Sequence, residues 1–304
     1  MRSTLKVKIK NILNLFKLAL KEWWAKDPFK ESAVIAYYAI FSLPGLLMVI
    51  LTIAGYFFGQ DAVSGRIASQ ITSTLGADTA HQVEDIIANG FKSRNSMFAT
   101  IIGILTILIG ATGVFVEFQK SLNSIWGVKH DVTKAGFLRL VKERVFSFGL
   151  IISVAFILIV SLVISATIAA LSSWVVSNFS ETVLTILQFV NAVLSLCILA
   201  GLFALMFKII PDAKIKWSHV GIGSIVTALL FELGKFTLGI YFSSADPGSG
   251  YGAAGSVILI LLWVSYSSMI VFYGAEFTYT YALWKEGKIV PAAYAEKVPA
   301  KLNT

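Results

Sequence analysis

The chain has 304 residues, of which 57% are hydrophobic and 14% are charged. Its mean hydropathy of +0.79 excludes an ordinary soluble domain and indicates an integral membrane protein. The formal net charge of +8 favours contact with anionic membrane lipid over nucleic acid, and no nucleic-acid partner is expected.

Residues 1–31 are predicted to form a cytoplasmic amphipathic N-terminal helix that lies in the membrane interface. Apolar side chains share one face and lysines lie toward the other: Leu5, Ile9, Ile12, Leu13, Phe16, Leu20 and Trp23 against Lys6, Lys10, Lys17 and Lys21. Because the lysines interrupt any apolar core, no signal peptide is expected. The helix is interpreted either as an anchor that orients the first span or as a sensor of lipid.

Residues 32–283 are predicted to form an all-α, six-helix transmembrane domain, because each apolar stretch reaches the roughly 20 residues that cross a hydrocarbon core. The predicted spans are about 32–58, 96–117, 145–171, 182–208, 217–243 and 252–282. Residues 59–95 are predicted to form an external cap of two short helices. Residues 284–304 are expected to be a flexible cytoplasmic tail.

The charges between the spans predict the orientation of the protein in the membrane. The segments 1–31, 117–144, 208–217 and 276–304 are net positive, and the intervening segments are net negative. The positive-inside rule therefore places both termini in the cytoplasm of a multi-pass inner-membrane protein. Tryptophans at the predicted span ends support the same map: Trp23, Trp24, Trp126, Trp174, Trp217 and Trp284.

The first span contains a proline and several polar side chains in "YYAIFSLPGLL". Pro44 removes a backbone donor and is predicted to kink the helix. Tyr37, Tyr38 and Ser42 add polar groups to the half that precedes the proline. A kinked helix with a polar face borders either a cavity or a packed neighbour, and Tyr37 and Pro44 are candidates for shaping a cavity.

The fifth span carries an acid and a base in "LFELGKFTLGIYF". Glu232 and Lys235 are three residues apart, so they share a helix face and can form an ion pair. Each charge costs about 2.5–3.5 kcal/mol at the centre of a bilayer. The pair is either an inward-facing structural bridge or part of a polar cavity, in which Lys235 meets an anionic headgroup or substrate.

Two further carboxylates lie at predicted cytoplasmic span ends, Glu117 in "VFVEF" and Glu276 in "YGAEF". They could flank an inner opening, bind a cation or exchange a proton, or they could bond to neighbouring helix ends. The candidate residues for a substrate or ion pathway are Glu232, Lys235, Glu117, Glu276, Tyr37 and Pro44. No catalytic residue, metal or cofactor is expected, because His81, His130 and His219 lie in separate segments.

Four segments together carry a resemblance: "YYAIFSLPGLL", "FVEFQKSLNSIWGV", "LFELGKFTLGIYF" and "YGAAGSVILILLWVSYSSMIVFYGAEFT". They resemble the YihY / virulence factor BrkB family of bacterial inner-membrane proteins, over about residues 20–282. The resemblance implies a six-helix layout and a place in the cell envelope. Some members of the family long carried the label ribonuclease BN, and others are linked to serum resistance or to tolerance of altered envelope lipid.

From these observations we expect a transporter or flippase-like protein for a lipid, lipid precursor or other anionic amphiphile in envelope homeostasis. A non-transporting scaffold for envelope-assembly partners is the alternative, and a membrane-bound enzyme is the least favoured class. Membrane lipids are the expected partners. A homodimer or an envelope-assembly partner is left open.

Overall fold

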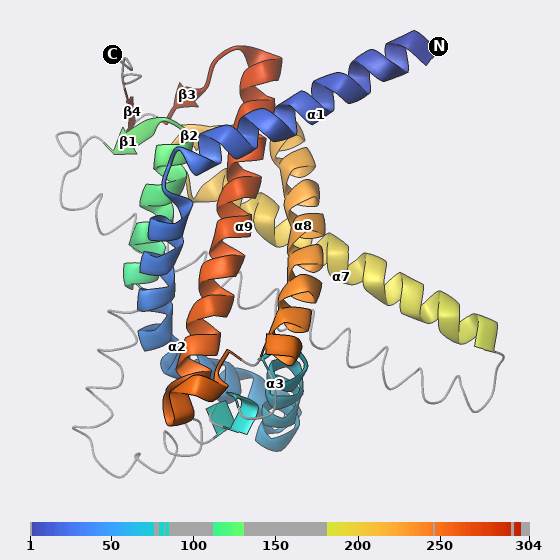
Figure 1. The fold of residues 1–304 in the computed structure, drawn as a ribbon, viewed down its shortest axis with the longest axis vertical. Coiled ribbons are helices and arrows are strands. Elements are labelled where there is room, and N and C mark those ends of the chain that lie inside the picture. The colour runs from blue at the N-terminus through green and yellow to red at the C-terminus, as the bar shows by residue number, and fades with distance from the viewer. Residues whose placement is uncertain are drawn as a thin grey trace. The chain divides into compact units, whose positions relative to one another are not determined.

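The computed structural model describes residues 2–75, 79–81, 83–84, 112–130, 181–245, 247–292 and 295–298. In this part of the chain the fold is helical, with four strands of two or three residues (Figure 1). The helices are α1 (Arg2–Trp24), α2 (Pro28–Phe58), α3 (Gln60–Leu75), α7 (Glu181–Ile209), α8 (Trp217–Ala245) and α9 (Gly255–Glu286), with the 3₁₀ helix η3 (Ser249–Ala254) before α9. The strands are β1 (Val128–His130), β2 (Ala213–Lys214), β3 (Val290–Pro291) and β4 (Ala295–Lys297).

Three helices are long and apolar enough to cross a membrane within the described residues: Phe189–Ile209 in α7, the whole of α8 and the whole of α9. Their bounds lie close to the predicted spans 182–208, 217–243 and 252–282. The predicted span 145–171 and most of 96–117 lie outside the described residues, apart from a helix over 112–125. The all-α membrane class is therefore confirmed, and the count of six spans stays a prediction.

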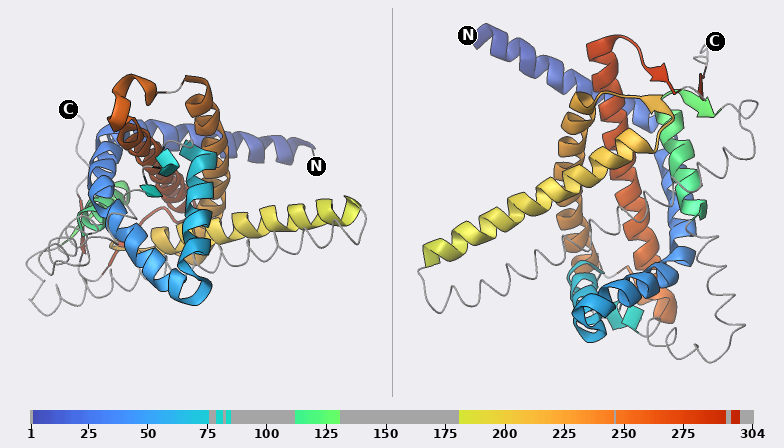
Figure 2. Two further views of the ribbon diagram at one scale, coloured as in Figure 1. Left: turned by 90° about the horizontal axis from the view of Figure 1, so that it is seen from below. Right: turned by 180° about the vertical axis from the view of Figure 1, so that it is seen from behind.

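Proline and glycine mark the ends of several helices. Pro28 begins α2, where its missing N–H would have no helical partner in any case. Gly59, with φ of 86°, separates α2 from α3, and Gly287, with φ of 72°, ends α9 by donating its N–H to Leu283 O at 2.8 Å. The ribbon of α2 changes direction along its length (Figure 2), and Pro44 within α2 gives a physical cause for a bend.

The chain divides into two compact units. Unit 1 comprises 1–19, 122–229 and 274–304, and unit 2 comprises 20–121 and 230–273. Helices α1, α8 and α9 each contribute residues to both units.

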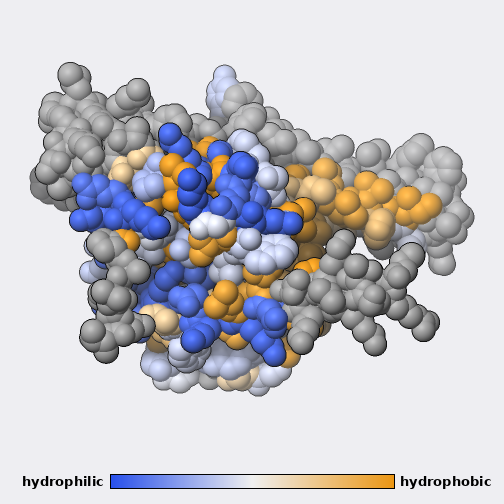
Figure 3. All heavy atoms as spheres, turned by 90° about the horizontal axis from the view of Figure 1, so that it is seen from above, coloured by the Kyte–Doolittle hydropathy of each residue, from blue (hydrophilic) through white to orange (hydrophobic). Residues whose placement is uncertain are grey.

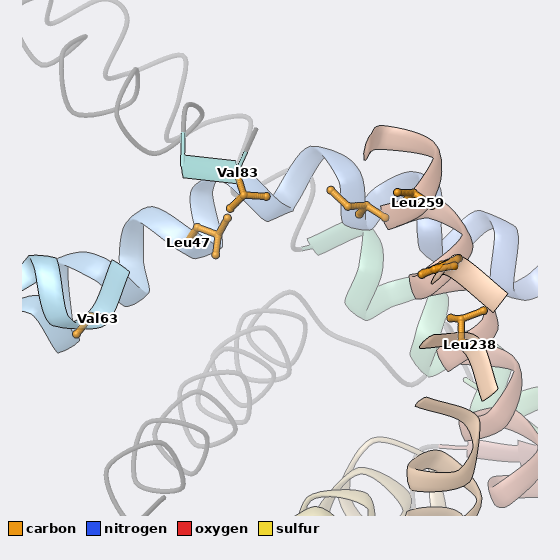
Figure 4. Close-up of a cluster of buried hydrophobic side chains, with 7 residues drawn as sticks. Leu47, Val63, Val83, Leu238 and Leu259 are labelled. Carbon is orange, nitrogen blue, oxygen red and sulfur yellow. The ribbon is translucent and has the colours of Figure 1, made fainter. Parts of the chain in front are cut away.

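Unit 2 has a core of aliphatic and aromatic side chains from α2, α3, α8 and α9 (Figure 4). Its buried members are Leu47, Val63, Val83, Leu238, Phe242, Leu259 and Ile260. Because Val63 and Val83 come from the segment predicted as an external cap, that segment packs into this core through α3 and residue 83. A second link within unit 2 joins α2 to α9, where the hydroxyl oxygens of Ser32 and Ser265 are 3.1 Å apart.

Unit 1 contains the four short strands. β1 pairs antiparallel with β4, and β2 pairs antiparallel with β3. Two backbone hydrogen bonds extend these ladders, from Ala292 N to Asp212 O and from Val298 N to Gly127 O, each at 2.9 Å. Strands β3 and β4 lie within 284–304, the segment that the sequence predicted as a tail. Hydrogen bonds hold that segment to β2, which precedes α8, and to β1, which follows the helix over 112–125.

Candidate functional site

The α8 ion pair, Glu232 with Lys235, lies in unit 2 on a helix apolar enough to cross a membrane. Lys235 Nζ is 2.8 Å from Glu232 Oε2, and the two side chains are 36% and 42% exposed, respectively. The pairing expected from their spacing is therefore present. Partial exposure leaves both groups accessible to a second polar partner.

The helix geometry places this pair on a flank of α8. Exposed apolar side chains on this part of the helix form a stripe: Leu233, Phe236 and Ile240. At about 100° per residue, Glu232 lies roughly 70° from the centre of that stripe. Lys235 lies about 60° from the centre of the packed face, which is marked by Gly234, Leu238 and Phe242. The pair thus lies between a face suited to acyl chains and a face that contacts other helices.

A second acid–base pair in unit 2 has the same spacing. Lys120 Nζ is 2.8 Å from Glu117 Oε1, and the carboxylate is the more buried partner. This hydrogen bond raises the pKa of Lys120, and the nearby Glu31 charge acts in the same direction. Glu31 Oε2 also accepts a hydrogen bond from Ser121 Oγ at 2.6 Å, which links α2 to this helix.

Glu276 differs from the other candidate acids, because its side chain is completely buried. It lies in unit 1 on α9, whereas Glu117 belongs to unit 2. Their predicted role as two carboxylates at one opening stays a prediction. Because it is completely buried, Glu276 belongs to the interior of unit 1. Polar neighbours must offset the free-energy cost of burying a carboxylate there.

In unit 1, a buried amide and a buried carboxylate join the helix over 112–125 to the connector between α7 and α8. Asn123 Nδ2 donates to Asp212 Oδ2 at 2.7 Å, and Asp212 N donates to Asn123 Oδ1 at 2.8 Å. Both side chains are buried. The two residues are 89 positions apart, and the sequence gave no sign that they meet.

The aromatic residues of α2 have different environments. The Tyr37 side chain is 59% exposed, and its ring centroid lies 5.6 Å from that of Tyr38 and 5.1 Å from that of Phe41. Tyr38 packs directly over Gly113, where a Cβ atom would overlap its ring. Tyr38 therefore fixes α2 against a neighbouring helix of unit 2, and Tyr37 faces outward on the same helix.

Two glycine–threonine contacts fix α8 against α9 in unit 1. A Cβ atom at Gly223 would overlap Thr278 Oγ1, and a Cβ atom at Gly274 would overlap Thr227 Oγ1. Thr227 Oγ1 donates to Gly223 O and Thr278 Oγ1 to Gly274 O, each at 2.7 Å. This register makes the helices antiparallel, with close backbone approach. The Gly-x-x-x-Thr pattern, which occurs at 223–227 and again at 274–278, is a local signal that could have indicated this contact.

Trp126, at the end of a predicted span, is buried within unit 1. Its side chain is 1% exposed, and its ring meets Tyr279 edge-on, with centroids 5.6 Å apart. Trp126 is thus a packing residue of unit 1. Within the described residues, no group of three or more His, Cys, Asp or Glu side chains is arranged to hold a metal ion.

The apolar helices and the partly exposed ion pair on α8 define an α-helical integral membrane protein. The chain belongs to the Virulence factor BrkB family, whose model matches residues 19–297, which confirms the resemblance found in the sequence.

Curated relatives are named UPF0761 membrane proteins. The one from Saccharophagus degradans is 27% identical over 263 residues, 86% of this chain and 58% of the relative. The one from Pasteurella multocida is 25% identical over 294 residues, 92% of this chain and 86% of the relative. This chain thus spans less than two thirds of the Saccharophagus protein. No solved structure matches the chain.

Proposed function

We propose that this protein is a transporter or flippase-like protein for an anionic amphiphile, either a lipid or a lipid precursor of the cell envelope. The proposal rests on one observation, the position of the α8 ion pair. Lys235 and Glu232 are bonded to each other on the flank of an apolar helix, beside exposed Leu233 and Phe236. An amphiphile has the same division between a charged headgroup and apolar chains.

The chemistry of the pair suits reversible binding of a phosphate group. An ammonium group has three N–H donors, so Lys235 can keep its bond to Glu232 and donate to a phosphate oxygen as well. Glu232 lowers the cost of placing the ammonium in a membrane helix, because it offsets the charge when no ligand is bound. In this mechanism the headgroup passes along the α8 flank while its acyl chains stay on the exposed apolar stripe.

The test is lipid movement in reconstituted vesicles. The purified full chain is placed in liposomes that contain phosphatidylglycerol with a fluorescent headgroup label, and transfer between leaflets is followed by external chemical quenching. Lys235→Gln is expected to slow transfer by about tenfold, since hydrogen bonds to charged groups contribute about 1.5–3 kcal/mol. Thr237→Ala is the matched control, because Thr237 is exposed on the same helix and donates a hydrogen bond to Leu233 O of that helix at 2.9 Å.

Two results would overturn the proposal. One is transfer by the wild type no faster than in protein-free vesicles. The other is transfer by Lys235→Gln as fast as by the wild type and by Thr237→Ala.

A non-transporting scaffold is the second candidate, and the exposure of α7 favours it. Within Phe189–Ile209 of α7, only 11% of the most apolar 18-residue stretch is buried within this chain, compared with 39% of the corresponding stretch of α9. Exposed Ile186, Phe189 and Val190 leave a face that another membrane protein could cover. Absence of lipid transfer, together with stable co-purification of a membrane partner that is lost on Phe189→Ser, would favour this function.

A further inference from the structure

Four exposed lysines gather where α8 begins and α9 ends, all in unit 1. β2 pairs with β3, with Lys214 opposite Val290, which brings the start of α8 beside the segment after α9. Lys216 Nζ is 2.8 Å from Glu286 Oε1, which joins the two helix ends directly. Lys285 and Lys288 are exposed in the same segment as Glu286.

Two tryptophans lie among these lysines, and both are exposed. The Trp217 and Trp284 side chains are 57% and 53% exposed. Lys208 Nζ lies 5.7 Å from the centre of the Trp217 ring, and Lys285 Nζ lies 4.7 Å from the centre of the Trp284 ring. Lys208 Nζ also donates to Ile215 O, which fixes the connector between α7 and α8. Indole rings with cations above them are suited to the headgroup layer of a membrane.

The charge of this surface is not balanced among its described residues. Glu286 is the acid within it, and its Oε1 is already 2.8 Å from Lys216 Nζ and 3.5 Å from His219 Nδ1. Lys214, Lys285 and Lys288 remain as exposed cations. Figure 3 colours the residues by hydropathy and shows hydrophilic and hydrophobic residues next to one another on the face turned to the viewer.

We propose that the surface formed by Lys214, Lys216, Trp217, Trp284, Lys285 and Lys288 is a binding site for an anionic phospholipid headgroup. Its lysine ammonium groups donate to the phosphate oxygens, and the two indoles lie against the glycerol and upper acyl region. The charge pattern of the sequence predicts that this end is cytoplasmic, where anionic lipid is abundant. The site is separate from the α8 ion pair and does not depend on lipid movement.

The test compares an anionic with a zwitterionic lipid on the purified full chain in neutral detergent. Short-chain phosphatidylglycerol and phosphatidylcholine are titrated separately, and bound lipid is counted by native mass spectrometry. The wild type is expected to prefer phosphatidylglycerol, and the preference is expected to fall by on the order of tenfold in Lys214→Gln/Lys285→Gln/Lys288→Gln. The matched control, Lys214→Arg/Lys285→Arg/Lys288→Arg, keeps the charge and is expected to keep the preference.

A second measurement uses the wild type alone, so that it does not depend on how the variants fold. Raising the salt from about 0.05 M to about 0.5 M is expected to reduce phosphatidylglycerol binding severalfold and to leave phosphatidylcholine binding unchanged, because exposed charges are screened. Equal binding of the two lipids by the wild type would overturn the proposal. So would an unchanged preference in the folded glutamine variant. Slow lipid transfer in vesicles with normal phosphatidylglycerol binding would instead count against the proposed transport function alone.

Discussion

The buried contacts of unit 1 and the ion pairs of unit 2 use polar side chains in different ways. In unit 1, four polar side chains that join segments are buried: Asn123, Asp212, Thr227 and Thr278. In unit 2 the ionised groups lie in pairs along single helices, Glu117 with Lys120 and Glu232 with Lys235, and three of these four side chains are more than one third exposed.

Burial decides what each kind of group can do. When a buried polar group loses its hydrogen-bond partner, the protein is destabilised by the full desolvation penalty of that group. Such a group therefore keeps its partner and stabilises the fold. An exposed ion pair contributes little to stability and can exchange partners with a ligand. The comparison predicts that substitutions in the unit 1 contacts reduce stability and that substitutions in the α8 ion pair change function instead.

The largest expected effect is at the α8–α9 contact. Gly223→Ala places a methyl group where Thr278 Oγ1 lies, and Thr278 can move only by losing its bond to Gly274 O. We expect a loss of about 3 kcal/mol in the free energy of unfolding, at the upper end for overpacking. Thermal unfolding in detergent measures it.

Gly221→Ala is the control for this substitution, because the same helix offers open space at that position. It is expected to be neutral or slightly stabilising, since alanine lowers the entropy of the unfolded chain. Equal destabilisation by the two alanines would show that the glycine–threonine contact is not the cause of the loss, because helix propensity alone favours alanine at both positions.

A smaller loss is expected at the buried connector. Asn123→Ala removes one hydrogen bond from Asp212 N and one to Asp212 Oδ2, and we expect about 2 kcal/mol of destabilisation. Asp212→Asn keeps an oxygen that can accept from Asn123 and keeps the backbone bond, so its effect should be less than half as large. Thermal unfolding of the three proteins side by side distinguishes these outcomes. A milder effect for Asn123→Ala than for Asp212→Asn would contradict the geometry.

Hydropathy predicted the helices well because it depends on local composition. The bounds of α7, α8 and α9 follow from long apolar stretches, and the Glu232–Lys235 pair follows from its spacing of three residues. Both features are set within one helix, so neither needs knowledge of the partner helices.

Contacts between distant segments could not be predicted in the same way. Asn123 and Asp212 are 89 residues apart, and no local pattern indicates that they bond. The exposure of Tyr37 and the contact of Tyr38 with Gly113 depend on which helix packs against α2, although both tyrosines are adjacent polar aromatics in the sequence. The strands β3 and β4 were likewise missed, since segments of two or three residues acquire order only from their pairing partners.

The α8 ion pair should show little effect on stability. Glu232→Gln/Lys235→Gln removes both charges and keeps similar side-chain volume, and we expect a change of less than about 1 kcal/mol in either direction. Thermal unfolding in detergent and headgroup-labelled lipid transfer are measured on the same preparation. A folded double variant with slow transfer fits the comparison between the units. A strongly destabilised variant would mean that this pair belongs with the buried groups of unit 1.

The smallest effect is expected at Lys120, where the sign of the pH dependence is specific. The Glu117 hydrogen bond raises the pKa of Lys120 above its usual value of 10.5. The folded state therefore holds this proton more tightly than the unfolded chain does, and the stabilisation is fully present below pH 10.5 and is lost as the pH rises through the raised value. Because the ammonium is mostly exposed, the contribution is only a few tenths of a kcal/mol.

Thermal unfolding of the wild type, Lys120→Gln and Glu117→Gln between pH 8 and pH 11.5 measures this contribution. The wild type should exceed Lys120→Gln slightly at pH 8, and the difference should vanish at the alkaline end. The double variant Glu117→Gln/Lys120→Gln should be no less stable than Glu117→Gln, because either substitution alone removes the pair. A stability difference between the wild type and Lys120→Gln that grows with pH would contradict a raised pKa of Lys120. It would assign the stabilising role in this helix to Glu117 and its neighbours instead.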